Sequence, residues 1–285
     1  MATAYDIDDI KLRYETQGFV HLKNVIPSDT LARAKTAFDA AAERSAAIRQ
    51  KLSDTKGPLR FFDIPDILDQ DPVFVELVDL STIFPVLVAA IGEDIQLNHT
   101  MARLFYPGPT FTGPWHSDIP QMLGVDHGSG TSVLVKAHFF IEDLTPDQGC
   151  LAFIPGSHRF PAGHPKPKIC DIDASESVVK TVPRAGDVVI FNTHVMHMAT
   201  DNRSGQVRKS IIYAYSHFWM KNLASGVPCD LERYATTVQR KQLFGVDIEG
   251  VQHIDRRLNI KKPIQLHSSL FKSSKRVLKR ILKRA

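Results

Sequence analysis

Cysteine is scarce in this sequence, and the cysteines that are present form no recognised pattern. Cys150, Cys170 and Cys229 are widely spaced within 285 residues, and no two of them form a CxxC pair. The odd number and the wide spacing support neither a zinc knuckle nor a disulfide framework. We therefore expect the reducing environment of the cytoplasm.

Long apolar runs are also lacking. The longest run, residues 83–91, is interrupted by Pro85, and it has about half of the ~20 residues that a membrane-spanning helix needs. The first ten residues show neither the basic nor the apolar region of a secretory signal. Hydrophobic residues nevertheless make up 43% of the chain and charged residues 23%, which predicts a globular protein with a sizeable core.

Acidic residues are absent from the C-terminal end. Residues 272–285 contain seven of the 35 Lys and Arg residues and no Asp or Glu, so the rest of the chain is slightly acidic. This distribution argues against a broad nucleic-acid-binding surface on the body of the protein. In the tail, Val277, Leu278, Ile281 and Leu282 recur at helical spacing. We expect a basic amphipathic tail that either packs on the protein or contacts an anionic membrane or an acidic carrier.

The pattern of helical and β-prone residues changes at about residue 96. Before it, helical patterns cover residues 6–17, 31–50 and 73–91, the last broken near Pro85, and a short strand is expected at Phe19–Leu22. After it come short β-prone runs bounded by Gly, Pro, Asn or Asp, at residues 97–106, 132–141, 150–154, 177–182, 187–192 and 209–217. Many short strands separated by turn residues are typical of a β-sandwich or barrel.

No internal repeat or low-complexity linker divides the chain, so we predict a single, mainly β domain with flanking helices over residues 1–271. It has a helical N-terminal third at 1–95, an all-β core at about 96–220 and a helical or irregular segment at 221–271. The basic tail, residues 272–285, follows this domain.

A His and an Asp lie two residues apart in the segment WHSD at 115–118. In an extended segment, side chains i and i+2 point to the same face, so His116 and Asp118 can converge on one ion. His194 and His197 follow a predicted strand and offer a third ligand. Two His and one carboxylate with open positions form the facial arrangement of non-haem Fe(II) oxygenases. The alternative is a surface loop in which a His lies beside a solvated Asp.

A cation suited to a dicarboxylic acid lies eleven residues after His197. A guanidinium such as that of Arg208 can hold a carboxylate through two parallel hydrogen bonds. If its strand runs beside the strand that leads to His197, Arg208 faces the metal pocket. The alternatives are that Arg208 is a surface residue beside Lys209, or that Arg203 is the anchor. Arg208 is favoured because Arg203 lies in a turn-like segment, DNRSG.

These residues and their spacing resemble the phytanoyl-CoA dioxygenase family, which belongs to the Fe(II)/2-oxoglutarate-dependent oxygenases. The resemblance is carried by HSD at 116–118, GCLAFIPGSH at 149–158, GDVVIFN at 186–192, and His197 with Arg208. The opening segment ETQGFVHLKNVIPSDTLARAK also resembles the N-terminal region of the family, so the match covers most of residues 10–220. The resemblance implies a double-stranded β-helix, or jelly-roll, core and the use of Fe(II), 2-oxoglutarate and O₂.

The resemblance also implies roles for individual residues. His116, Asp118 and His197 fall at the positions of the iron ligands, and Arg208 falls at the position of the arginine that binds the distal carboxylate of 2-oxoglutarate. No further catalytic residue is implied.

Three further residues fall where family members contact the cosubstrate, namely Met101, His138 and Arg60. His138 stands where some members have a Trp, and Ala199 stands where some have a Ser. These departures leave the metal ligands intact but alter the finer contacts of the cosubstrate. We therefore do not transfer phytanoyl-CoA as the substrate.

The activity implied by the resemblance is hydroxylation of a C–H bond in a small or medium-sized organic molecule. 2-Oxoglutarate and O₂ are converted to succinate and CO₂. The carboxylate of Asp118 disfavours halogenation, because related halogenases lack it, whereas desaturation, epimerisation and cyclisation stay open.

Two other classes are a non-catalytic metal-binding jelly-roll protein and a zinc-dependent hydrolase or isomerase of the cupin type. The intact metal-ligand pattern together with Arg208 counts against the first, and the second has no need of Arg208. Candidate substrate contacts are Trp115, Gln121 and Phe105, with packing as the alternative role for each.

Overall fold

The computed structural model describes residues 5–109, 115–118, 132–161, 164–169, 171–222 and 227–246. Its contacts divide the chain into two units, Met1–Val246 and Asp247–Ala285, and all the described residues belong to the first unit. The predicted tail at 272–285 and its boundary therefore lie outside the described residues. Among the described residues no single helix is long and apolar enough to cross a membrane, although one bent pair, Pro72–Asp79 with Phe84–Ile91, reaches that length and composition together.

The N-terminal part contains mostly helices. The elements are α1 (Ile7–Gln17), β1 (Phe19–Leu22), α2 (Ser28–Arg44), α3 (Ala46–Lys56), β2 (Phe61–Ile64), α4 (Ile67–Gln70), α5 (Pro72–Glu76), η1 (Leu77–Asp79) and α6 (Phe84–Ile91). The predicted strand at Phe19–Leu22 is confirmed. The predicted helix at 31–50 is instead two helices that meet at Ser45. Pro85 lies in the first turn of α6 rather than breaking a longer helix, because its missing N–H costs no hydrogen bond in a first turn.

The β-rich part follows, and each predicted β-prone run contains a strand. The strands are β3 (Ile95–Phe105), β4 (Leu134–Phe140), β5 (Leu151–Phe153), β6 (Val179–Lys180), β7 (Val188–Asn192), β8 (His197–Ala199) and β9 (Arg208–His217). The 3-10 helix η2 (Ser157–Arg159) and the helices α8 (Leu231–Tyr234) and α9 (Val238–Leu243) complete the described elements. Strands β2 and β8 have no counterpart among the predicted strands.

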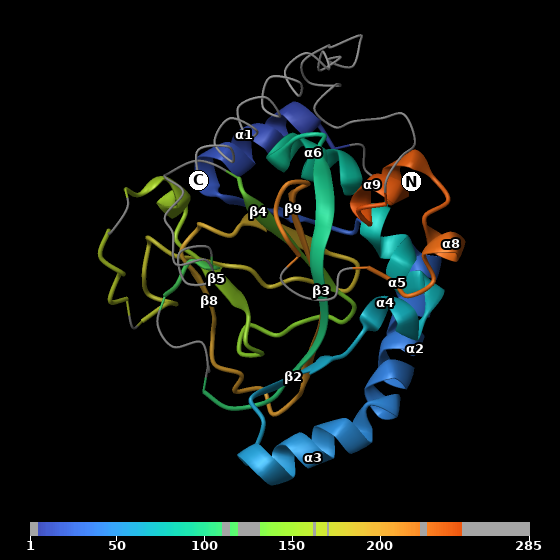
Figure 1. Ribbon diagram of the computed structural model, residues 1–285. Helices are drawn as coiled ribbons and strands as arrows, with labels where there is room; N and C mark the ends of the chain where they lie inside the picture. The colour runs from blue at the N-terminus through green and yellow to red at the C-terminus, as the bar shows by residue number, and fades with distance from the viewer. Residues whose placement is uncertain are drawn as a thin grey trace, which may run out of the picture. The chain divides into compact units, whose positions relative to one another are not determined.

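The strands form two antiparallel sheets (Figure 1). The major sheet has the order β1-β7-β4-β9-β3-β2, and the minor sheet has the order β6-β5-β8. The sheets face each other, because the Phe19 ring of β1 stacks on the Phe153 ring of β5 at 4.3 Å, and the Phe191 ring of β7 lies 4.8 Å from the His197 ring of β8. Two facing antiparallel sheets with these connections confirm the predicted jelly-roll core. The N-terminal part adds the edge strands β1 and β2 to this core.

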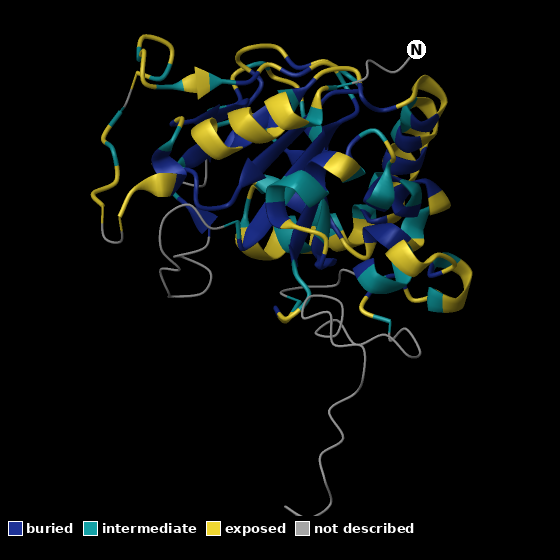
Figure 2. Cartoon of the chain, turned by 90° about the horizontal axis from the view of Figure 1, so that it is seen from above, coloured by how far each residue is buried: buried dark blue, intermediate teal, exposed yellow. Residues whose placement is uncertain are grey.

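The major sheet has two chemically different faces. Side chains alternate along β9, and Ile211, Tyr213 and Tyr215 belong to the main hydrophobic core with the helices. Tyr213 donates a hydrogen bond to the carbonyl of Phe74 at 2.7 Å, which fastens α5 to this outer face. Figure 2 shows the dark blue strands beneath helices whose outer faces are yellow. The other face, which we call the inner wall, is turned toward the minor sheet and carries Arg208.

Candidate metal centre

His116, Asp118 and His197 come together between the two sheets. Each offers one ligand atom, and these atoms all lie within 4.8 Å of one another. The backbones of His116 and His197 form an antiparallel bridge through two hydrogen bonds of 3.1 and 2.9 Å. The amide of Asp118 donates to the carbonyl of Thr193 at 2.8 Å. The segment that contains His116 and Asp118 is therefore fixed beside the strand that carries His197.

A hydrogen bond orients the imidazole of His197 toward the carboxylate of Asp118. Nδ1 of His197 bonds to the carbonyl of Val195 at 2.8 Å, so its Nε2 faces Asp118 and lies 3.6 Å from Oδ2. Nε2 of His116 lies 3.9 Å from Oδ1 of the same carboxylate. A backbone partner at one ring nitrogen is the usual means by which proteins orient a metal-binding imidazole.

The protonation states of these three groups suit a metal ion. Burial lowers the pKa of His116 to about 4 and also lowers the pKa of His197. Burial alone would raise the pKa of Asp118, but the Lys136 ammonium and the two imidazoles hold it well below its usual range. Neutral imidazoles and an ionised carboxylate are the forms that bind metals. Two nitrogens and one carboxylate oxygen that converge in a largely buried site fit Fe(II).

Arg208 is a buried cation on the inner wall. It is 2% exposed, and no carboxylate among the described residues forms an ion pair with it. Its guanidinium lies 4.5 Å above the ring of Phe105 and donates to the carbonyl of Gly149, while its Nε has no hydrogen-bond partner. Burial and the nearby Arg103 lower the pKa of Arg208 to about 10. A buried guanidinium without a counter-ion is costly, so this position favours an anionic ligand.

Arg203 has a different environment. Its side chain is 78% exposed and pairs with Asp201 at 3.1 Å. Of the two arginines considered from the sequence, Arg208 is the one that the fold buries between the sheets.

Cross-strand pairing orders the residues of the inner wall in rows. The first row contains His99, Ala214, Lys136 and Phe191, and Lys136 places it at the metal centre, because its Nζ lies 2.9 Å from Oδ2 of Asp118. We call this row the metal row. Residues i and i+2 of a strand share a face, so the rows of the inner wall follow one another in steps of two residues. Along β9 they lead from Ala214 in the metal row to Arg208.

The next row contains two of the predicted cosubstrate contacts. Met101 pairs with Ile212, and Ile212 pairs with His138. His138 is buried, its ring lies 5.3 Å from that of Phe191, and its Nδ1 has no hydrogen-bond partner. Burial, with Lys136 and Arg208 nearby, lowers the pKa of His138 well below its usual value. Met101 and His138 therefore line the wall between the metal row and Arg208.

The remaining predicted residues are placed elsewhere or outside the described residues. Arg60 is exposed and lies beside Gly108. Trp115 is buried, donates to the carbonyl of Ile169 at 3.3 Å, and packs with Met198 on the outer side of the minor sheet. Phe105 supports the guanidinium of Arg208. Gln121 lies outside the described residues.

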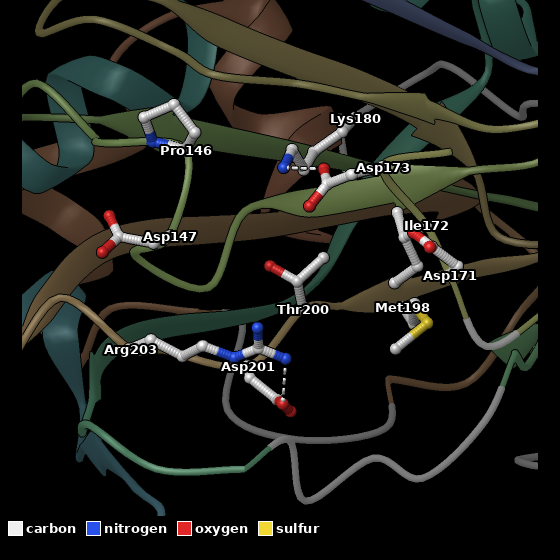
Figure 3. A pocket seen from close by; sticks show the side chains of 10 residues that line it. All are labelled: Pro146, Asp147, Asp171, Ile172, Asp173, Lys180, Met198, Thr200, Asp201 and Arg203. Atoms are coloured by element: carbon white, nitrogen blue, oxygen red, sulfur yellow. Dashed lines mark hydrogen bonds and ion pairs between the residues drawn. The ribbon is translucent and has the colours of Figure 1, made fainter. Parts of the chain in front are cut away.

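A hollow of about 600 Å³ lies near the minor sheet but does not include the metal centre (Figure 3). Met198 and Thr200 line it, together with the ion pairs Lys180–Asp173 and Arg203–Asp201. Because side chains alternate along β8, His197 and Ala199 point to the opposite face.

Sequence reasoning missed two polar residues of the metal row. Lys136 lies in the segment LVKAHFF, two residues before His138, so the strand period already places both on one face. His99 is buried, and its Nδ1 bonds to Oδ1 of Asn98 at 3.0 Å. Burial and the nearby Lys136 lower the pKa of His99 to about 4. A single lysine within an apolar strand was the available signal for Lys136, and the position two residues before Met101 was the available signal for His99.

Comparison with known proteins agrees with this geometry. The family model for phytanoyl-CoA dioxygenase (PhyH) matches residues 14–210. Among curated proteins, the chain is 24% identical over 230 residues to an ectoine dioxygenase of Nocardia farcinica, covering 71% of this chain and 75% of the relative. It is 24% identical over 233 residues to a probable phytanoyl-CoA dioxygenase of Caenorhabditis elegans, covering 72% and 73%.

Solved structures share the fold. EctD from S. alaskensis, solved with 2-oxoglutarate and 5-hydroxyectoine, matches with a TM-score of 0.55 at 20% identity over 78% of this chain and 80% of that one. HygX from Streptomyces hygroscopicus, solved with nickel and 2-oxoglutarate, matches with a TM-score of 0.56 at 16% identity over 77% and 90%. The epimerase SnoN matches with a TM-score of 0.52 at 18% identity over 74% and 83%. With the family match across most of its length, the chain belongs to the phytanoyl-CoA dioxygenase family and is an oxidoreductase of the iron- and 2-oxoglutarate-dependent class.

Proposed function

We propose that this protein hydroxylates a C–H bond of a small or medium-sized organic molecule, with conversion of 2-oxoglutarate and O₂ to succinate and CO₂. One observation carries the proposal. A largely buried His-Asp-His cluster lies between the two sheets of the jelly roll, and Arg208, a buried guanidinium with no carboxylate partner among the described residues, lies on the inner wall of the same core. The cluster provides ligands for Fe(II), and Arg208 provides a partner for the distal carboxylate of 2-oxoglutarate.

Each residue has a definable task in this proposal. His116, Asp118 and His197 would hold Fe(II) on one side and leave the opposite positions free. Arg208 would orient 2-oxoglutarate, with Met101 and His138 beside its carbon chain. When bound, iron and 2-oxoglutarate with O₂ supply the oxidant that removes hydrogen from the substrate. The protein contributes ligand geometry, orientation and a site that is largely closed to water.

Epimerisation is the second candidate reaction, because one solved structure with this fold is described as an epimerase. Desaturation and cyclisation are candidates together with epimerisation, because they begin with the same hydrogen abstraction. The Asp118 carboxylate occupies the position that related halogenases leave free for a halide, so halogenation is not proposed.

The test is succinate formation by the purified protein, supplied with Fe(II), 2-oxoglutarate and O₂. We expect slow turnover without substrate and stimulated turnover when a compound from a small-molecule panel binds. The product mass then separates the reactions, because hydroxylation adds one oxygen atom, whereas epimerisation leaves the mass unchanged. Absence of any succinate from a metal-loaded protein would contradict the proposal and favour a non-catalytic metal-binding protein.

A further inference from the structure

Lys136 is a nearly buried cation at the level of the metal centre. It lies in β4, with Ala214 and Phe191 as its cross-strand neighbours. Its ammonium nitrogen is 2.9 Å from Oδ2 of Asp118, and 12% of its side chain is exposed. The ammonium therefore faces the space in which a metal and its ligands would lie.

The fold does not require a lysine at this position. Its cross-strand neighbours on the inner wall, Ala214 and Phe191, are buried and apolar, and an apolar side chain would complete this wall without cost. An ammonium removed from water is costly unless it is paired. In the metal-free site the carboxylate of Asp118 is the ion-pair partner of Lys136. A bound divalent ion would be neutralised in part by the same carboxylate. Lys136 then needs another anion.

The charges on the described inner wall do not balance once the site is loaded. Fe(II) brings two positive charges and 2-oxoglutarate two negative ones. Among the side chains, Asp118 is negative, and Lys136 and Arg208 are positive. Arg103 and Asp63 cancel each other in an ion pair of 2.7 Å, and the buried imidazoles are neutral. One positive charge is left without a partner, and a group with a single negative charge would neutralise it.

The order of the rows indicates where that group would bind. Arg208 and His138 lie on one side of the metal row, and that side accommodates the cosubstrate. On the other side Asn98 donates to Oγ of Ser216 at 3.1 Å and to the carbonyl of Lys221 at 3.2 Å. This second side is polar and lies across the metal row from Arg208. A substrate that enters there meets the ammonium of Lys136 beside the metal.

We infer that Lys136 is a substrate-binding residue and that the substrate carries a carboxylate, which the Lys136 ammonium holds next to the metal. This inference rests on the proposed function, because the charge count includes bound Fe(II) and 2-oxoglutarate. It adds a substrate class and a residue that determines specificity. A carboxylate held at Lys136 would also fix the distance between the metal and the C–H bond that reacts.

Two competing roles are separable from this one. Lys136 could be a positioning residue that holds Asp118 for the metal, in which case its loss weakens metal binding. It could instead be a ligand of the cosubstrate, in which case its loss weakens 2-oxoglutarate binding. In the role inferred here, both bind without it, and only the response to a substrate carboxylate is lost.

The experiment uses the anaerobic complex of the protein with Fe(II) and 2-oxoglutarate, which is followed by its visible charge-transfer band. The probes are acetate, propionate and benzoate, each paired with its uncharged primary amide. We expect the carboxylates to perturb the band saturably and the amides to leave it unchanged. Lys136→Met removes the charge while keeping an unbranched side chain of nearly the same length, and we expect it to weaken carboxylate binding about tenfold or more. Lys136→Arg should restore part of the response.

The control is Lys209→Met, because Lys209 lies in the same sheet and is ion-paired with Asp39 and Glu142. It should leave the carboxylate response as in the unaltered protein. Equal carboxylate binding by Lys136→Met, equal binding of acids and amides, or no saturable binding of any carboxylate would overturn the inference. The inference would also be overturned if the Lys136→Met variant did not form the charge-transfer band. That result would mean that Lys136 positions Asp118 for the metal or binds the cosubstrate. If the unaltered protein forms no band at all, the proposed function itself fails, and the two failures are thereby distinguished.

Discussion

His116 and His197 are joined by a pair of backbone hydrogen bonds, in which the amide of each donates to the carbonyl of the other at 3.1 and 2.9 Å. Their ring centroids lie 4.4 Å apart. The backbone bridge between His116 and His197, the first residue of β8, therefore sets the separation of the two metal-binding imidazoles. A site built on paired backbone is held more rigidly than one built on free loops.

Removal of a metal ligand should abolish metal binding. We expect His116→Ala and Asp118→Ala to lose stoichiometric Fe(II) binding and succinate formation, because two ligands hold a divalent ion far less well than three. Metal content and succinate are the measurements. His164→Ala alters an exposed histidine and should change neither. Retention of one Fe(II) per chain by both ligand variants would place the metal elsewhere.

Removal of Arg208 should act on the cosubstrate. Arg208→Ala loses charge-assisted hydrogen bonds that are worth about 1.5–3 kcal/mol, so we expect the KM for 2-oxoglutarate to rise by about tenfold or more. Fe(II) binding should persist. Arg203→Ala is the matched control, because that side chain is exposed and paired with Asp201. If Arg203→Ala raises the KM and Arg208→Ala does not, the anchor is misassigned.

The strands and the metal ligands could be predicted because their signals are local. Short β-prone runs between turn residues located six strands, and the two-residue spacing of His116 and Asp118 already placed their side chains on one face. Strand β8 could not be predicted, because three residues, HMA, contain no β-branched side chain. It forms because β5 lies alongside, with Ala152 opposite Met198.

The wall around the metal could not be read from the sequence, because its rows join strands that are far apart in the chain. Lys136 and His99 share a row only through Ala214 of β9. The outward placement of Trp115 follows from its position next to His116, but its partner could not be predicted. Alternation sends neighbouring side chains to opposite sides, and the partner of Trp115 is the distant carbonyl of Ile169.

The hydroxyl of Tyr213 should contribute to stability but not to metal binding. Tyr213→Phe leaves the buried carbonyl of Phe74 without its donor at 2.7 Å, which costs about 1–3 kcal/mol. Urea unfolding measures this cost, and Fe(II) binding to the folded variant should be unchanged. Tyr234→Phe, in the short helix α8, serves as the control and should unfold as the unaltered protein does. A change in metal binding by Tyr213→Phe would show that the two faces of the sheet are coupled.

Stability of the metal-free protein should fall as the pH falls from 6.5 toward 4. His99 and His116 have pKa values of about 4 when folded, against about 6.5 in an unfolded chain. Between these values the unfolded chain binds protons that the folded chain does not, so acid favours unfolding. Urea unfolding at pH 7 and pH 5 in the presence of a chelator measures the loss. His99→Gln removes one of the histidines whose pKa is lowered by folding and should reduce that loss. An equal loss in the variant would mean that His99 titrates normally.

The support beneath Arg208 should be sensitive to a single methyl group. Gly149 has φ +68°, and a Cβ added there would lie 2.6 Å from the ring of Phe105, on which the guanidinium of Arg208 rests. Gly149→Ala therefore combines a backbone cost of about 1 kcal/mol with displacement of that ring, and we expect a several-fold higher KM for 2-oxoglutarate. Gly245 has φ +67° with no atom within 4 Å of the added Cβ. Gly245→Ala should therefore show the backbone cost alone in urea unfolding and leave the KM unchanged. Equal KM values for the two variants would show that Phe105 does not set the position of the guanidinium.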